Sequence, residues 1–179
     1  CDPDSIFRQS GFTVKDFKDP DHKTPYLQGG QLLANCVEAT GCEELGLLLG
    51  QLAEASHLGL AGFLMRAAPN VKHALRALVE NLDLHDDGGT ATLEIGQDYT
   101  CLGFAIQVPG LLAVDQAYDL AAVMLYNVMK SLCGPDWVAN SVKLPRREPD
   151  SWRPYQQFFR TSLFFNSTEC SITSNNQCL

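Results

Sequence analysis

Positive charge is scarce in this sequence. Lysine and arginine together number 13, against 21 aspartate and glutamate residues, and the net charge is −8 at pH 7. The only local basic group, Lys143 with Arg146 and Arg147, is followed at once by Glu148 and Asp150. Modules that bind nucleic acids neutralise phosphates with a basic face. This composition therefore argues against direct DNA binding by this chain.

Long apolar runs are also lacking. The longest one, residues 111–129, contains Asp115, Gln116 and Asp119, whereas a membrane-spanning helix needs about 20 predominantly apolar residues. No membrane segment is predicted. With 179 residues, 45% of them hydrophobic, the chain has the length for one domain and enough apolar side chains for a core. We expect a cytoplasmic location.

Catalytic and metal-binding motifs are missing as well. The sequence has no HExxH motif, no CxxC pair, no Cys/His set at zinc spacing, no GxSxG elbow and no phosphate-binding glycine loop. The seven cysteines are an odd number, and Cys36, Cys101 and Cys133 stand in apolar surroundings, so reduced thiols are expected. We therefore predict no enzyme activity, no catalytic residue, no metal site and no cofactor.

Two alternatives to this interpretation stay open. His22 lies near Asp19 and Asp21 in a polar loop, which could hold a cation weakly, although a solvated loop is the simpler explanation. An enzyme that used His57 or Cys101 would be expected to hold that group in a cleft with a perturbed pKa. For His57, which precedes an apolar helix, a capping or core role is favoured.

The hydrophobic periodicity changes near the middle of the chain. Before residue 85 apolar residues recur at helical spacing, over 4–10, 26–39, 42–52, 57–65 and 71–82. Alternation over 91–95 and 99–108 predicts a hairpin, and further strands are expected at 140–144, 163–166 and 170–173. A long helix at 113–133 and a short one at 152–159 complete the pattern. The predicted fold class is α+β: an N-terminal helical half, then an antiparallel sheet of about four to five strands packed on a long central helix.

Glycines punctuate the apolar stretch 45–78. Gly46, Gly50, Gly59 and Gly62 interrupt helical segments, and because glycine inside a helix is unfavourable by up to about 1 kcal/mol, they are interpreted as sites of close packing. Asn70 is predicted to begin the next helix as its N-cap.

Aromatic and methionine side chains of the hairpin and the long helix suggest a ligand cavity, because ligand pockets are mostly apolar with few polar groups. Arg66, at the end of an apolar helix, could meet a ligand carboxylate, although cations are also favoured there by the helix dipole. For the apolar residues the alternative is an ordinary core. The candidate ligand-binding residues are Arg66, Phe104, Tyr118, Met124, Tyr126 and Met129.

The predicted helix 113–133 has a polar stripe so narrow that the rest of its surface is apolar. A helix with so wide an apolar face makes contacts on more than one side. We expect it to pack on the sheet and also on a ligand or a second copy of the chain. A homodimer is therefore predicted.

Several segments, in the right order, resemble one family of regulators. TGCEELGLLLG at 40–50 and LGLAGFLMRAAPNVKHAL at 58–75 carry the resemblance, with a lead-in at 19–26 and the stretches 152–159 and 163–166. Together they resemble the N-terminal, arabinose-binding-type effector domain of AraC/XylS-family bacterial transcription regulators. Asn70 and His73 depart from the family pattern, which has threonine and glutamate there; this removes the reciprocal partner of a capping box.

The resemblance implies an effector-sensing and dimerisation domain over 1–179, with DNA contacted only through a helix-turn-helix domain that these residues do not contain. The effector is expected to be a small apolar or weakly acidic metabolite that modulates DNA binding by unequal affinity for two states. The alternative is a ligand-independent dimerisation or partner-docking module.

Overall fold

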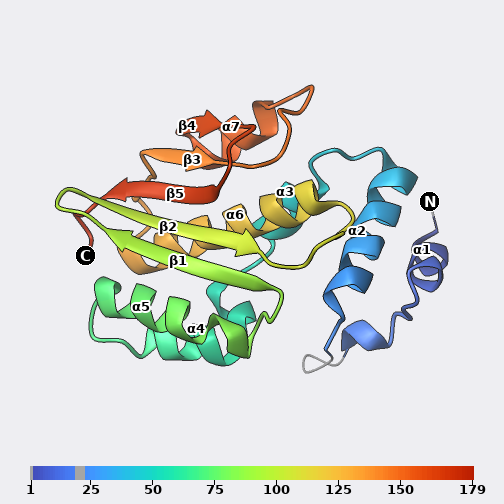
Figure 1. Cartoon of the computed structure of the whole chain (residues 1–179), viewed down its shortest axis with the longest axis horizontal. Helices are drawn as coiled ribbons and strands as arrows, with labels where there is room; N and C mark the ends of the chain where they lie inside the picture. Colours follow the sequence, from blue (N-terminus) through green and yellow to red (C-terminus); the bar gives the residue numbers. More distant parts are fainter. Residues whose placement is uncertain (1, 19–22) are drawn as a thin grey trace.

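The computed structural model describes residues 2–18 and 23–179. An N-terminal series of helices is followed by a sheet that packs on one long helix (Figure 1), as the α+β prediction required. The helical half comprises α1 (Pro3–Gln9), η1 (Asp16–Lys18), α2 (Tyr26–Thr40), α3 (Leu45–Gln51), η2 (Ala55–Leu58), α4 (Gly59–Arg66), α5 (Val71–Asn81) and η3 (Leu82–Leu84). The remainder comprises β1 (Gly89–Ile95), β2 (Tyr99–Ile106), α6 (Val114–Cys133), β3 (Ser141–Lys143), α7 (Arg153–Phe159), β4 (Ser162–Phe164) and β5 (Cys170–Asn175).

The five strands form one sheet in the order β1-β2-β5-β3-β4. The predicted hairpin is confirmed, with Leu93 paired to Leu102. The expectation of a wholly antiparallel sheet is wrong, because β4 runs parallel to β3. The reason is the connection between them: the chain leaves β3, crosses over through α7 and re-enters in the same direction, which a tight hairpin cannot do.

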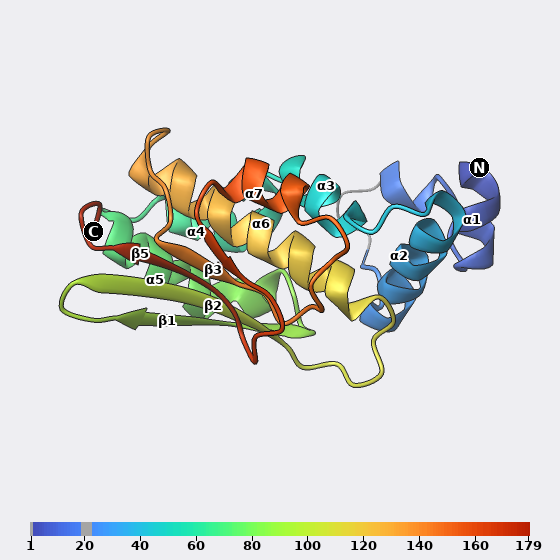
Figure 2. The ribbon, with the colours of Figure 1, turned by 90° about the horizontal axis from the view of Figure 1, so that it is seen from above.

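The long helix α6 lies across one face of the sheet, with α3 on its other side (Figure 2). On α6, only Val114, Lys130 and Ser131 are exposed. The wide apolar face is thus explained by contacts within the chain, and it gives no support to a dimer contact at this helix.

Two polar side chains of α6, Gln116 and Asn127, pack against α3 rather than facing solvent. The side chain of Gln116 accepts a hydrogen bond from the Gly46 N–H at 2.8 Å and donates one to the Glu43 carbonyl at 2.8 Å. Further along, the Asn127 amide donates to the carbonyls of Gly50 (3.1 Å) and Ala53 (2.8 Å). These amides satisfy backbone groups at the two ends of α3.

Close approach explains three of the four glycines in the 45–78 stretch. A Cβ built on Gly46 would lie 2.1 Å from the Gln116 carbonyl oxygen, one on Gly50 2.6 Å from Val123, and one on Gly62 2.2 Å from the Ala55 carbonyl oxygen. The packing interpretation is wrong for Gly59, which has open space around it and a φ of +55°. Gly59 is needed for its backbone conformation.

Helix caps agree with the sequence. The Asn70 side chain accepts a hydrogen bond from the His73 N–H at 3.0 Å and begins α5. His57 takes a capping role, since its Nδ1 accepts from the Glu54 N–H at 2.9 Å. Within residues 2–18 and 23–179, no single helix is long and apolar enough to cross a bilayer. The segments Leu45–Gln51 and Ala55–Arg66 meet the length and apolarity criteria only when taken together, and the pair is bent by 95°.

Candidate functional site

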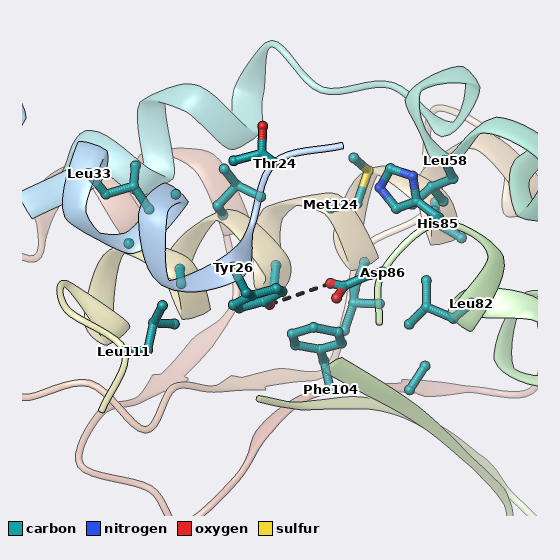
Figure 3. Close-up of a pocket in the computed structure, with 18 of the residues that line it drawn as sticks. Thr24, Tyr26, Leu33, Leu58, Leu82, His85, Asp86, Phe104, Leu111 and Met124 are labelled. Carbon is teal, nitrogen blue, oxygen red and sulfur yellow. Dashed lines mark hydrogen bonds between the residues drawn. The ribbon is translucent and has the colours of Figure 1, made fainter. Parts of the chain in front are cut away.

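A cavity of about 390 Å³ lies where α2, α6, β2 and the turn after η3 meet (Figure 3). This volume is within the roughly 300–1,000 Å³ of small-molecule sites. Its lining is mainly aliphatic and aromatic, with polar side chains only at Thr24, Tyr26, His85 and Asp86 among the described residues. The arrangement can enclose a small molecule with an apolar body and a single polar end.

One face of α6 forms a wall of this cavity. Ala117, Leu120, Ala121 and Met124 line it. Ala117 is three and four residues before Leu120 and Ala121, and Met124 is four and three residues after them, a spacing that puts side chains on one helix face. The two alanines leave space that larger side chains would fill. A neighbouring face of the same helix holds α3 through Gln116 and Asn127.

The polar end of the cavity is built around the Asp86 carboxylate. Its Oδ1 accepts a hydrogen bond from the Gly88 N–H at 2.9 Å, and its Oδ2 accepts one from the Tyr26 hydroxyl at 3.4 Å. Burial, with Asp86 close by, raises the pKa of Tyr26 well above its ordinary range. Tyr26 therefore keeps its proton and acts as the donor to Asp86.

The aromatic rings of Tyr26 and Phe104 pack directly against Gly88 and Gly89, respectively. A Cβ at Gly88 would come within 2.2 Å of the Tyr26 ring, and one at Gly89 within 2.1 Å of the Phe104 ring. Any side chain there would displace a ring that lines the cavity. The segment 86–89, between η3 and the start of β1, thus shapes the pocket.

Two of the predicted ligand-binding residues, Phe104 and Met124, line the cavity. The other four are not among its lining residues. The Tyr118 hydroxyl accepts from the Ile106 N–H at 3.3 Å, and Tyr126, nearly fully buried, donates to the Phe159 carbonyl at 3.1 Å. Met129 is buried in the core, and Arg66 is exposed in the last turn of α4.

Sequence reasoning missed Tyr26, His85 and Asp86 as site residues. Tyr26 and Asp86 are 60 positions apart, and no local pattern links them. The paired glycines after Asp87 were the available signal, because adjacent glycines often mark close approach of a bulky group. His85 is exposed and also borders the cavity.

A second polar cluster lies in the interior, apart from the cavity. Arg146 and Asp119, both almost fully buried, form an ion pair, and the Tyr155 hydroxyl donates to the Asp119 Oδ2 at 2.6 Å and also accepts from Arg146. Burial raises the pKa of Asp119 to about 6, against the opposing pull of Arg146 and Tyr155. Arg146 also donates to the Glu43 carbonyl at 3.3 Å. The cluster ties α6 to α7 and to the loop before α3.

The thiol prediction needs one correction. Cys133, at the end of α6, forms a disulfide with Cys178, with their Cα atoms 5.3 Å apart. The pairing was not visible in the sequence because the two cysteines are 45 positions apart and meet only when the C-terminal segment packs beside α6. Cys36, Cys42, Cys101 and Cys170 are free.

Metal-binding groups do not gather in the described ranges, where no cluster of three or more His, Cys, Asp or Glu side chains is suited to a cation. The loop with His22, Asp19 and Asp21 lies outside the described residues. Cys101 is half-buried on β2, and His57 is exposed and engaged as a cap.

Comparison with known proteins places this fold. The family described as the arabinose-binding domain of AraC transcription regulators, N-terminal, matches residues 1–179. No curated protein gives a match. Among solved structures, the transcriptional regulator CdpR from Pseudomonas aeruginosa is similar in fold, with a TM-score of 0.68 at 20% identity over 99% of this chain and 54% of that chain.

This chain spans about half the length of that regulator, and the likeness shows a shared fold. The matching family is described as a domain of transcription regulators. Taken with the family match over every residue, the fold and the cavity beside α6 lead to one conclusion: the chain belongs to the family of N-terminal arabinose-binding domains of AraC transcription regulators.

Proposed function

We propose that this chain is the ligand-sensing domain of an AraC-type regulator and that a small, mainly apolar effector binds in the cavity beside α6. The observation that supports the proposal is the cavity itself: about 390 Å³ of space with an apolar lining and one polar end, in a domain of a ligand-sensing family. The effector would alter DNA binding by a part of the regulator outside this chain, acting from the cytoplasm as predicted from the sequence.

The position of α6 offers a physical route for such coupling. The helix contributes a wall of the cavity through Ala121 and Met124, and its buried polar side chains hold α3 and the Asp119–Arg146 pair. A ligand that contacts α6 differently in two arrangements of the domain would shift their populations. Phe104, opposite α6 on β2, is proposed to contact the same ligand.

The proposal is tested by measuring thermal unfolding with neutral apolar probes, for example decan-1-ol and indole. A probe at 100 times its Kd stabilises the folded state by about 2.7 kcal/mol, which corresponds to a rise in Tm of roughly 5–10 °C for a chain of this size. If no probe in such a panel shifts Tm, the sensing function is not supported.

A cavity-filling variant makes the test specific. Ala121→Phe places a ring in the cavity and should abolish the probe-induced shift. The matched control is Ala39→Phe, which makes the same change at an exposed position of α2 and should leave the shift intact. Equal shifts in both variants would mean that the probes bind elsewhere.

A ligand-independent docking role is the second candidate, and exposed apolar side chains favour it. Leu52, directly after α3, is 76% exposed, and on α4 Leu60 is 57% and Phe63 68% exposed. Large exposed apolar groups on neighbouring helices are common at protein interfaces. Sedimentation velocity over a range of concentrations tests the predicted homodimer; a Leu52→Glu variant should dissociate it if these helices form the contact.

A further inference from the structure

If the cavity is an effector site as proposed above, the charges and hydrogen-bond acceptors at its polar end restrict which head group the effector can have. The lining residues include one carboxylate, Asp86, and neither lysine nor arginine among the described residues. No ion pair in the part of the chain that the structure describes involves Asp86. A half-buried carboxylate without an ion-pair partner among the described residues thus borders a mainly apolar space.

Asp86 retains capacity to accept hydrogen bonds. An ionised carboxylate offers about four lone-pair positions, and two are used, by the Gly88 N–H at 2.9 Å and by the Tyr26 hydroxyl at 3.4 Å. The second bond is at the long limit of hydrogen-bond distances. A ligand donor could therefore add to the existing bonds of Asp86 or replace the one from Tyr26.

The surroundings disfavour a second negative charge. Asp87 follows Asp86 directly, and besides burial, which is the larger cause, both carboxylates raise the pKa of Tyr26 at the cavity wall. The nearby His85 is the only lining residue able to carry positive charge in the described ranges. A carboxylate bound beside Asp86 would meet like charge in a poorly solvated site, which is unfavourable.

We propose that the effector is an apolar molecule that ends in a hydrogen-bond donor, a protonated amine or a hydroxyl, and that Asp86 accepts a hydrogen bond from this head group. The Asp86 carboxylate lies beside the Tyr26 hydroxyl, joined to it by the long hydrogen bond of 3.4 Å (Figure 3). Of the two classes expected from the sequence, the apolar one is kept, and the weakly acidic one is disfavoured at this position.

Three probes with the same ten-carbon chain test this assignment on the full chain at pH 7: decylamine, decan-1-ol and decanoate, each below its micelle concentration, by isothermal titration calorimetry. Decylamine should bind about 10- to 100-fold more tightly than decanoate, the range expected for a hydrogen bond to a charged group, with decan-1-ol between them. Equal or tighter binding of decanoate overturns the head-group assignment but leaves the sensing function. Binding of none of the three, together with no response to indole, overturns both.

Paired variants locate the effect. Asp86→Asn keeps an acceptor for Gly88 but removes the charge, and it should weaken decylamine about 10- to 100-fold while changing decan-1-ol little. The control is Asp87→Asn, which changes net charge equally at an exposed neighbour and should leave the order of the probes unchanged. An equal loss in Asp87→Asn would show that the preference comes from overall charge and would overturn the contact with Asp86.

Tyr26→Phe provides a second readout in case Asp86→Asn folds poorly. The change frees the Asp86 Oδ2 from its long hydrogen bond, so decylamine should bind as tightly as in the unmodified chain or more tightly. Loss of decylamine binding, with decan-1-ol binding retained, would show that Tyr26 rather than Asp86 receives the head group, and would overturn the proposal.

Discussion

Replacement of Gly46 by alanine should separate two helices that the fold holds in direct contact. Gly46 lies on α3 against the backbone of α6, and a Cβ built there would be 2.1 Å from the Gln116 carbonyl oxygen. Favourable contacts between heavy atoms are about 3.5–4.0 Å long, so the helices must move apart by more than about 1 Å. The obstacle is backbone, which cannot rotate away as a flexible side chain would.

The expected loss of stability is the balance of opposing effects. Overpacking of this kind costs about 1–3 kcal/mol, and the hydrogen bond from the Gly46 N–H to the Gln116 side chain, worth about 0.5–1.5 kcal/mol, would be strained. Alanine is the better helix former by about 0.8–1.0 kcal/mol. We therefore expect Gly46→Ala to lower the free energy of unfolding by about 2 kcal/mol.

Gly29→Ala is the matched control. Gly29 lies inside α2, and a Cβ there would be 3.7 Å from the Thr24 methyl carbon, an ordinary van der Waals contact. The helix-propensity gain then applies without a clash, and this variant should be more stable than the unmodified chain by up to about 1 kcal/mol. The same glycine-to-alanine substitution is thus predicted to lower the free energy of unfolding at Gly46 and to raise it at Gly29.

Urea unfolding followed by circular dichroism measures both changes, and thermal unfolding gives an independent check. For a chain of this length each kcal/mol corresponds to a Tm shift of about 2–4 °C. A Gly46→Ala variant as stable as the unmodified chain would refute the close contact between α3 and α6. A drop in stability for both variants would show that glycine is required for some other reason.

Three further predictions concern the buried ion pair and the disulfide. Arg146→Met should destabilise the fold by about 3–5 kcal/mol in urea unfolding, because it leaves the buried Asp119 carboxylate without its positive countercharge. Burial raises the pKa of Asp119 from its ordinary 3.8 to about 6, so the native state binds more protons than the unfolded state between these values. The free energy of unfolding should therefore fall by about 3 kcal/mol in total as the pH rises from about 3 to about 7, with about 2 kcal/mol of that fall between about pH 4 and about pH 6. Asp119→Asn should abolish this slope, and an unchanged slope would assign it to other groups. Reduction of the Cys133–Cys178 disulfide should lower stability by up to about 4 kcal/mol, given their separation of 45 residues, whereas a Cys133→Ser variant should be insensitive to reductant.

The local patterns of the sequence predicted the elements well, because each depends on nearby residues. Asn70 predicted the start of a helix, and the alternation of apolar and polar residues around Leu93 and Leu102 predicted a hairpin. What could not be predicted was the direction of β4, since two strands joined by a short helix read the same in sequence whether they pair parallel or antiparallel. The five strands were expected, but the mixture of antiparallel and parallel strand pairs was not.

The site was only half predictable, for a physical reason. Phe104 and Met124 were found because apolar residues on a strand and a helix of one core tend to converge. Tyr126 belongs to the same pattern but turns its hydroxyl to a backbone carbonyl away from the cavity. Tyr26 lies near the beginning of the helical half of the sequence and Asp86 directly after its end, and only the folded chain brings their side chains together.

The place of β5 in the sheet has a consequence for synthesis. This strand, Cys170–Asn175, is the middle strand of the sheet, between β2 and β3, although it is synthesised after the other four strands. Until it emerges, the β1–β2 hairpin and the β3–β4 pair have no strand to join them. The sheet therefore closes late, and a nascent chain truncated before residue 170 exposes two unpaired strand edges, which are prone to aggregation.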